Sequence, residues 1–242
     1  MIRATVAFLV LLCCIGFAGS TDLDHDGLSD EFEQSLLTQF APVFHVSASD
    51  CAGLPAEFTP DSVRPVAAAV NGTIYGQVFR SGPYIEIHYY HLWERDCGSL
   101  GHALDAEHVS GLLSSGETPR ALYWFAAAHQ ATVCELNTAS SAAALHAEER
   151  GPDVWISEGK HASFLTSKLC GKGCGADACK LTKRLEPARL INIGEPGAPM
   201  NGAVWVNSPA WPMASKMTTD FDPARLEALK ASGGGLILFQ PS

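Results

Sequence analysis

The sequence predicts a mainly β protein, a β-sandwich with peripheral α-helices and an N-terminal loop and helix. Short segments rich in β-branched and aromatic residues recur along the chain and are separated by Gly- and Pro-containing turns. Few helical patterns interrupt them, which is typical of a sandwich. The N-terminal loop is acidic and has the spacing of a calcium loop. We expect a signal peptide at residues 1–20, an EF-hand-like calcium loop and helix at 21–40, and a β-sandwich domain at 41–242.

The first twenty residues resemble a secretory signal. A positive start with Arg3 is followed by an almost wholly apolar stretch over residues 4–17 and by the small residues Ala18, Gly19 and Ser20. This apolar core is too short to cross a membrane, and no other long apolar run follows it. We therefore expect a secreted or periplasmic protein, cleaved near Ser20, with no transmembrane segment in the mature chain.

The chain is acidic, with 16 basic and 26 acidic residues and a formal net charge of −10. Losing Arg3 with the signal makes the mature chain one unit more negative. Such a chain should not bind nucleic acid non-specifically, because the phosphate backbone would repel it. An acidic composition does suit a protein that holds divalent cations.

Six of the eight cysteines lie outside the signal, and an even number in an exported protein indicates three disulfides. The pairing stays open at this point. A zinc site built from the last three cysteines is the alternative, although their spacing is not that of a C-x-x-C pair. The six are Cys51, Cys97, Cys134, Cys170, Cys174 and Cys179.

Residues 22–33 match the twelve-residue calcium loop at each side-chain position. Carboxylates stand at loop positions 1, 3, 5, 9 and 12, the glycine of the sharp turn is Gly27, and position 7 would contribute a backbone carbonyl. Carboxylates this close repel one another unless a cation neutralises them. The predicted calcium ligands are Asp22, Asp24, Asp26, Leu28, Asp30 and Glu33. With no helix before it, the loop is expected to fix the following helix to the domain.

The remaining elements follow in order. Apolar residues at helical spacing predict a helix over residues 29–40, which stops before Pro42. Strands are expected at residues 73–80, 84–93, 121–127, 153–157, 189–193, 203–206 and 236–239. An alanine-rich stretch predicts a helix at 138–149, and a second short helix is expected at 223–231.

A second candidate cation site lies in residues 101–108, which follow a strand-like run. Asp105 and Glu107 are two apart and share a face of an extended chain, and His102 and His108 lie close enough to join them. Asp96 is a further candidate ligand. Carboxylates mixed with imidazole suit a hard or borderline divalent cation whose identity stays open. A solvated polar turn is the alternative interpretation.

Three further histidines, His91, His129 and His161, each close a strand-like segment. Histidines at several strand ends would converge on one rim of a sandwich. Each of them taken alone is equally consistent with a structural residue.

These residues resemble known families. Residues 101–107 resemble the G-H-R-H-D-W-E heptapeptide of the necrosis- and ethylene-inducing peptide-like proteins, with His102, Asp105 and Glu107 matching. They equally resemble the H-E-G-D-W-E motif of the vacuolar protein sorting-associated protein 62 family. His129, residues 159–164 and residues 40–44 are similar to other elements of that second family. The N-terminal loop resembles the calcium loops of dockerin-like and thrombospondin-type repeats.

The first resemblance implies a β-sandwich with a divalent-cation site that serves membrane damage. We expect an exported, non-catalytic metal-binding protein that binds a membrane lipid headgroup or a glycan. Two alternatives stay open: a metal-dependent hydrolase with His129 or His161 as general base and Lys160 assisting an anionic substrate, and a structural exported domain. Whether the protein is an enzyme is not decided by the sequence. A membrane-binding loop would draw on Trp205 and Trp211, which core packing explains equally well.

Overall fold

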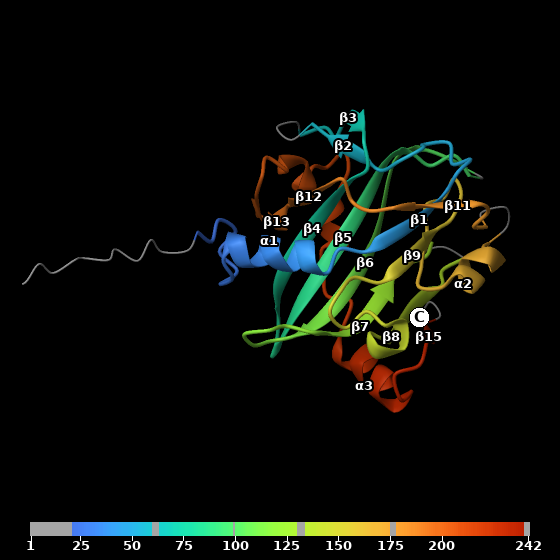
Figure 1. The fold of residues 1–242 in the computed structure, drawn as a ribbon. Helices are drawn as coiled ribbons and strands as arrows, with labels where there is room; N and C mark the ends of the chain where they lie inside the picture. The colour runs from blue at the N-terminus through green and yellow to red at the C-terminus, as the bar shows by residue number, and fades with distance from the viewer. Residues whose placement is uncertain (1–20, 60–62, 99, 130–133, 175–177, 240–242) are drawn as a thin grey trace, which may run out of the picture.

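The computed structural model describes residues 21–59, 63–98, 100–129, 134–174 and 178–239. Two sheets pack face to face (Figure 1). The larger sheet has seven strands in the order β12-β4-β5-β6-β7-β8-β15, and the smaller has four in the order β10-β9-β1-β11. The expected mainly β sandwich with few helices is therefore confirmed.

The bounds of the elements are as follows. The large sheet contains β4 (Thr73–Ser81), β5 (Tyr84–Arg95), β6 (Ala103–Ser114), β7 (Ala121–Ala126), β8 (Asn137–Ser141), β12 (Arg189–Asn192) and β15 (Ile237–Phe239). The small sheet contains β1 (Val43–Ser47), β9 (Asp153–Ile156), β10 (Ser163–Phe164) and β11 (Thr182–Leu185). Two short pairs join β2 (Ala56–Phe58) to β3 (Ala67–Val70) and β13 (Gly194–Glu195) to β14 (Ala198–Pro199). The helices are α1 (Asp30–Gln39), α2 (Ser167–Lys172) and α3 (Pro223–Ala231), and the 3-10 turns are η1 (Ala143–Leu145), η2 (Val204–Asn207) and η3 (Met213–Lys216).

The main core lies between the two sheets and is closed at one end by α1. Alternate residues of β1, such as Phe44, meet alternate residues of β5, such as Ile87, because side chains two apart share a face. Helix α1 lies close to β4 at Gly76, where an added Cβ would meet the Leu37 side chain at 2.2 Å. The Tyr89 hydroxyl also donates to the Leu37 carbonyl.

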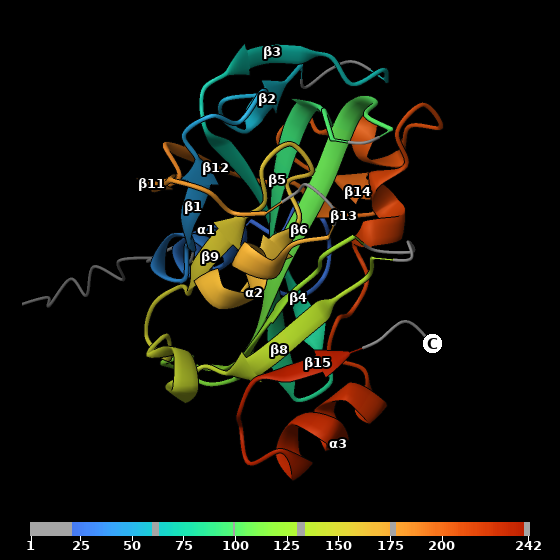
Figure 2. The same cartoon turned by 90° about the vertical axis from the view of Figure 1, so that its right-hand side faces the viewer.

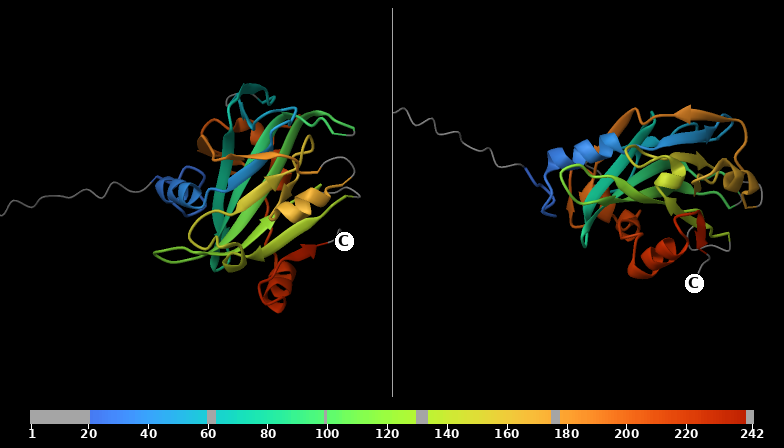
Figure 3. Two further views of the ribbon diagram at one scale, coloured as in Figure 1. Left: turned by 45° about the vertical axis from the view of Figure 1, so that its right-hand side comes forward. Right: turned by 60° about the horizontal axis from the view of Figure 1, so that its bottom comes forward.

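The C-terminal segments cover the opposite face of the large sheet. Trp205 of η2 packs with Tyr75 and Tyr90 in one cluster, while Leu229 of α3 packs with Phe125 in another. Figure 2 shows α3 beside β15 at one end of the sheet, and the right-hand view of Figure 3 shows the red C-terminal segments on the side away from β1. Trp205 is completely buried, so the core interpretation holds for this residue.

Most of the expected elements are present, but two are wrong. Residues 137–141 form β8 and pair with β7 and β15, where a helix was expected over residues 138–149. The backbone of this segment is hydrogen-bonded to a strand on each side, so tertiary pairing overrides the helical propensity of its residues. Residues 204–207 form the 3-10 turn η2 in place of the expected strand, because both of its buried apolar residues fill the core over β4 and β5.

Three disulfides link Cys51 to Cys97, Cys134 to Cys174, and Cys170 to Cys179. This confirms the expectation of three bridges and supplies the pairing that the sequence left open. Within the described ranges no helix is both long and apolar enough to cross a membrane. The expected signal peptide lies outside the described residues.

Candidate cation and ligand sites

The long hairpin of β5 and β6 places the predicted ligands of the second cation site around one cavity, although no three of these described side chains bring ligand atoms within 4.8 Å of one another. Trp93 pairs with Asp105 and His91 pairs with Glu107, so the two carboxylates lie on one face of β6. They open into a cavity of about 380 Å³ at one end of the hairpin. Its walls are Asp96, His102, Leu104, Asp105, Ala106, Glu107, His129, Lys160, Trp211 and Lys216.

Glu107 carries the clearest sign of a missing partner. Its Oε2 atom is buried and has no hydrogen-bond partner among the described residues, and the residue is only 8% exposed. Burial, reinforced by the neighbouring Asp105 charge, raises the pKa of Glu107 to about 8. A divalent cation would relieve this cost by neutralising the carboxylate.

His161 holds Asp105 in place from behind the cavity. Its ring stacks on Trp93 at a centroid distance of 3.9 Å, with Nδ1 2.8 Å from Asp105 Oδ2 and Nε2 3.2 Å from Asp50 Oδ1. Burial lowers the pKa of His161, but the hydrogen bonds to Asp105 and Asp50 outweigh it and raise the pKa to about 9. An imidazolium with both nitrogens donating is suited to orienting Asp105, not to accepting a proton.

Lys160 and His102 both approach Asp96. The Lys160 ammonium is 2.8 Å from Asp96 Oδ2, and His102 Nε2 is 3.7 Å from the same oxygen. The other oxygen, Oδ1, accepts a hydrogen bond from the Gly98 backbone. Asp96 therefore presents one oxygen to the cavity, and that oxygen is shared by two nitrogen groups.

The backbone around the cavity is strained and firmly held. Leu104, His129 and His161 all adopt the left-handed region, with φ of 62°, 55° and 55°. Such conformations cost about 1–3 kcal/mol for non-glycine residues and concentrate at functional sites. The Cys51–Cys97 disulfide and two hydrogen bonds to the Gly159 carbonyl fix the adjoining loops.

His91 was expected to close a strand, but β5 continues to Arg95, so His91 lies inside the strand and is a core residue. It is fully buried, accepts a hydrogen bond from Trp93 Nε1 and lies 2.7 Å from Ser163 Oγ. Of the three, only His129 lines the cavity.

The acidic N-terminal loop gathers carboxylates at the start of α1. One oxygen from each of Asp22, Asp24 and Asp26 lies within 4.8 Å of the others. Buried oxygens of all three lack hydrogen-bond partners among the described residues, including both oxygens of Asp24. Asp30 is placed differently, since its Oδ1 accepts a hydrogen bond from the Leu23 backbone. The Leu28 side chain packs into the core.

Glu33, at the last position of the loop, is completely buried. Asn192 of β12 donates to its Oε2, while its Oε1 has no partner among the described residues. Burial and the charge of Asp24 raise the pKa of Glu33 to about 8, and the same kind of environment raises that of Asp24 to about 6. Buried, mutually repelling oxygens without donors are the environment that a hard cation relieves.

A further cluster, which the sequence did not predict, lies under the C-terminal segments and contains His108, which was expected to join Asp105 and Glu107 but does not line their cavity. His88, His108 and Asp220 offer ligand atoms within 4.8 Å of one another, close enough for one divalent ion. The cluster is also hydrogen-bonded within itself. Asp220 Oδ2 accepts from Ser110 and lies 2.9 Å from His108 Nε2, while His88 Nε2 lies 2.8 Å from Glu86. The alternating polar residues of β5 are the sequence pattern that indicates this cluster, but Asp220 lies too far along the chain to be assigned to the cluster from that pattern.

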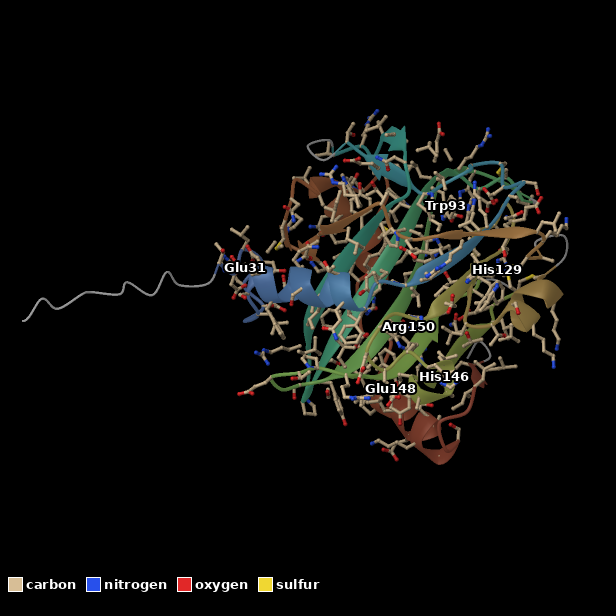
Figure 4. All side chains as sticks on the ribbon, in the orientation of Figure 1. Glu31, Trp93, His129, His146, Glu148 and Arg150 are labelled. Carbon is tan, nitrogen blue, oxygen red and sulfur yellow. A yellow bond between two sulfur atoms is a disulfide. The ribbon has the colours of Figure 1, made fainter. Side chains whose placement is uncertain are left out.

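The structure thus brings Asp96, His102, Asp105 and Glu107 to one cavity with His129. It adds Lys216 and Trp211, which arrive from the C-terminal segments and had no motif to mark them as part of this site. The two candidate sites are well separated. Figure 4 shows Glu31, at the start of α1, far from both Trp93 and His129.

Comparison with known proteins gives similarity at the level of fold. No protein-family model matches the chain, and no curated protein matches it significantly. The similar solved structures are toxin-fold proteins of the necrosis- and ethylene-inducing kind. One is NLPPya in complex with mannosamine, at 18% identity and a TM-score of 0.47, covering 82% of this chain and 88% of that one. Another is Necrosis and Ethylene inducing Protein 2 from the causal agent of cocoa's Witches Broom disease, at 17% identity and a TM-score of 0.43, covering 82% and 90%.

A third structure, described as a toxin fold for microbial attack and plant defense, is 19% identical with a TM-score of 0.45 and covers 70% and 76% of the two chains. The resemblances to the vacuolar protein sorting-associated protein 62 family and to dockerin-like loops find no support among these matches. At such identities the roles of individual residues rest on the geometry of this chain alone.

Proposed function

We propose that this protein is an exported, non-catalytic binding protein that recognises a polar target, a glycan or a lipid headgroup, through a divalent cation. The cation would be held in the cavity by Asp96, His102, Asp105 and Glu107. A separate calcium ion in the N-terminal loop would stabilise the fold. Export itself rests on the signal-like residues 1–20.

The observation that carries the proposal is the buried, unpartnered oxygen of Glu107 beside Asp105 in an open cavity. Two carboxylates on adjacent outward positions of one strand repel each other when ionised. His161 fixes Asp105 from the protein side, which leaves its other oxygen toward the cavity. Oxygen ligands with one imidazole fit a hard or borderline divalent cation, and a cation here would keep open positions for a target.

The calcium proposal rests on the five unpartnered carboxylate oxygens of the N-terminal loop and on Glu33 in particular. Glu33 is completely buried and hydrogen-bonded to Asn192, so an ion bound to it would join the loop, α1 and β12. This arrangement supports a structural role for calcium.

The hydrolase alternative retains one residue in a suitable place, because His129 lines the same cavity. For this alternative to hold, the cation-loaded protein would have to hydrolyse an ester or a glycoside, and His129→Gln would have to abolish turnover. A purely structural domain would bind no cation at the cavity.

The deciding experiment is cation binding by chelator-treated protein, followed by calorimetry and by metal analysis after dialysis. The double variant Asp105→Asn, Glu107→Gln should hold one cation per chain fewer than wild type while remaining folded. The matched control is Glu148→Gln, Glu149→Gln, which removes two exposed carboxylates from another surface. If the first double variant holds as many cations as wild type, the cavity is not a cation site and the proposal fails.

Binding of a target follows from the same samples. Glucosamine and mannosamine, which similar toxin-fold structures contain, serve as first glycan probes, and phosphatidylcholine vesicles with added glycolipid serve as the lipid probe. Binding of these probes should require the cation and should be lost in the double variant Asp105→Asn, Glu107→Gln.

A further inference from the structure

We propose that the target of the cavity carries an anionic group, such as a phosphate, and that Lys160 changes partner when the cation binds. Without the cation, Lys160 pairs with Asp96. With the cation in place, the Lys160 ammonium is released to the anionic group of the target. This inference rests on the cation site proposed above and names the class of ligand that the site takes.

The charges that face the cavity give the first argument. Three carboxylates, from Asp96, Asp105 and Glu107, face two ammonium groups, from Lys160 and Lys216. This leaves one net negative charge when all five groups are ionised, and a divalent cation reverses the sign. The loaded cavity is therefore positive, which favours a target with an anionic group over the same target without one.

Competition at Asp96 gives the second argument. Asp96 Oδ1 already accepts a hydrogen bond from the Gly98 backbone amide, whereas Oδ2 is held by side chains that line the cavity. Lys160 contacts Oδ2 at 2.8 Å. A cation bound to Oδ2 would repel the ammonium and weaken its contact with Asp96, because two positive charges would lie against one carboxylate oxygen.

The placement of the Lys160 stem gives the third argument. Its methylene groups lie against Gly98, where an added Cβ would meet them at 2.4–2.7 Å. The neighbouring His161 is locked between Asp50 and Asp105, and Gly159 is bonded to the loop at Cys97. The backbone and the stem are therefore held in place, which keeps the displaced ammonium beside the cavity.

The remaining walls suit a small phosphate-bearing molecule. A volume of about 380 Å³ is at the lower end of small-molecule sites. Trp211 offers an aromatic surface, and its ring stacks on the buried Trp205 ring at a centroid distance of 5.7 Å. Lys216, from η3, supplies the second ammonium. A sugar phosphate or the phosphorylated headgroup of a lipid would satisfy these features together.

The test uses Lys160→Met, which keeps the length of the stem but removes its charge. Manganese is titrated into wild type and into the double variant Asp105→Asn, Glu107→Gln. The binding step that the double variant lacks is assigned to the cavity. Lys160→Met should strengthen this step about tenfold, because the competing charge is gone, and should weaken binding of mannose 6-phosphate to the loaded protein at least tenfold. Lys168→Met, an exposed lysine of α2, is the control and should change neither.

The opposite directions of the two changes separate this role from a merely structural one, since a damaged cavity would lose both affinities. Mannose without phosphate should bind at least tenfold more weakly than mannose 6-phosphate. Inorganic phosphate and phosphatidylcholine vesicles with added phosphatidylinositol then distinguish a soluble from a lipid source of the same group.

If no cation step is lost in the carboxylate variant, the proposed function itself fails. If that step is present but Lys160→Met leaves both affinities unchanged or lowers both, the exchange of partners is refuted. Equal binding of mannose and mannose 6-phosphate likewise refutes the anionic ligand.

Discussion

Replacing Glu33 by glutamine should stabilise the cation-free protein at alkaline pH and abolish its response to calcium. Burial raises the folded-state pKa of Glu33 from 4.5 to about 8. The stability associated with its protonated form is therefore fully present below pH 4.5 and is lost as the pH rises through 8. A shift of this size corresponds to an upper limit of about 4–5 kcal/mol in the free energy of unfolding.

Differential scanning calorimetry in chelator and in excess calcium, from pH 5 to 9, measures this effect. Without the cation, wild type should melt progressively lower as the pH rises, by about 10 °C in total for a protein of this size. The melting temperature of Glu33→Gln should fall less than that of wild type in chelator, because the variant has no Glu33 charge to bury and only the other buried groups still titrate. Calcium should raise the melting temperature of wild type alone.

The control is Glu31→Gln, an exposed glutamate of the same helix, which should behave as wild type. The reasoning is refuted if Glu33→Gln is less stable than wild type in chelator at pH 8. It is equally refuted if the variant keeps the whole calcium response.

Three further changes test the packing around the cavity. His161→Gln leaves buried Asp50 without its charged partner and should lower the free energy of unfolding by about 3–5 kcal/mol at pH 7. Because the pKa of His161 is raised to about 9, this difference in stability from wild type should shrink above pH 9 in denaturant melts. Gly111→Ala places a Cβ 2.7 Å from a buried tryptophan ring and should cost about 1–3 kcal/mol in thermal melts, with cation binding retained. Cys51→Ser with Cys97→Ser should cost about 2–4 kcal/mol and weaken cation binding at the cavity, as seen by calorimetry; unchanged affinity would show that the bridge does not hold the site.

Local patterns were sufficient for much of the fold. The period-two alternation of residues 84–93 and the apolar spacing of residues 29–40 predict β5 and α1, because each segment already contains the face that it buries. The failure at residues 138–149 has the opposite cause. Alanine and serine have no strong face of their own, so the strands on either side decide their conformation.

The sequence by itself determined the candidate cation ligands that are close along the chain. Asp22, Asp24 and Asp26 are near neighbours in any compact loop, and Asp105 and Glu107 share a face in any extended strand. Their residue types and spacing already specify the chemistry, so both candidate sites could be predicted without a fold.

Only the tertiary structure decided what surrounds those ligands. Lys160, His161 and Lys216 reach the cavity or its supporting wall from segments more than fifty residues away, and Asp220 joins His88 from still farther. No local pattern predicts these contacts. They arise because the two sheets pack against each other and the C-terminal segments pack on the opposite face of the large sheet. The same packing removes water from Glu33 and Glu107, and this burial raises the pKa of both carboxyl groups to about 8.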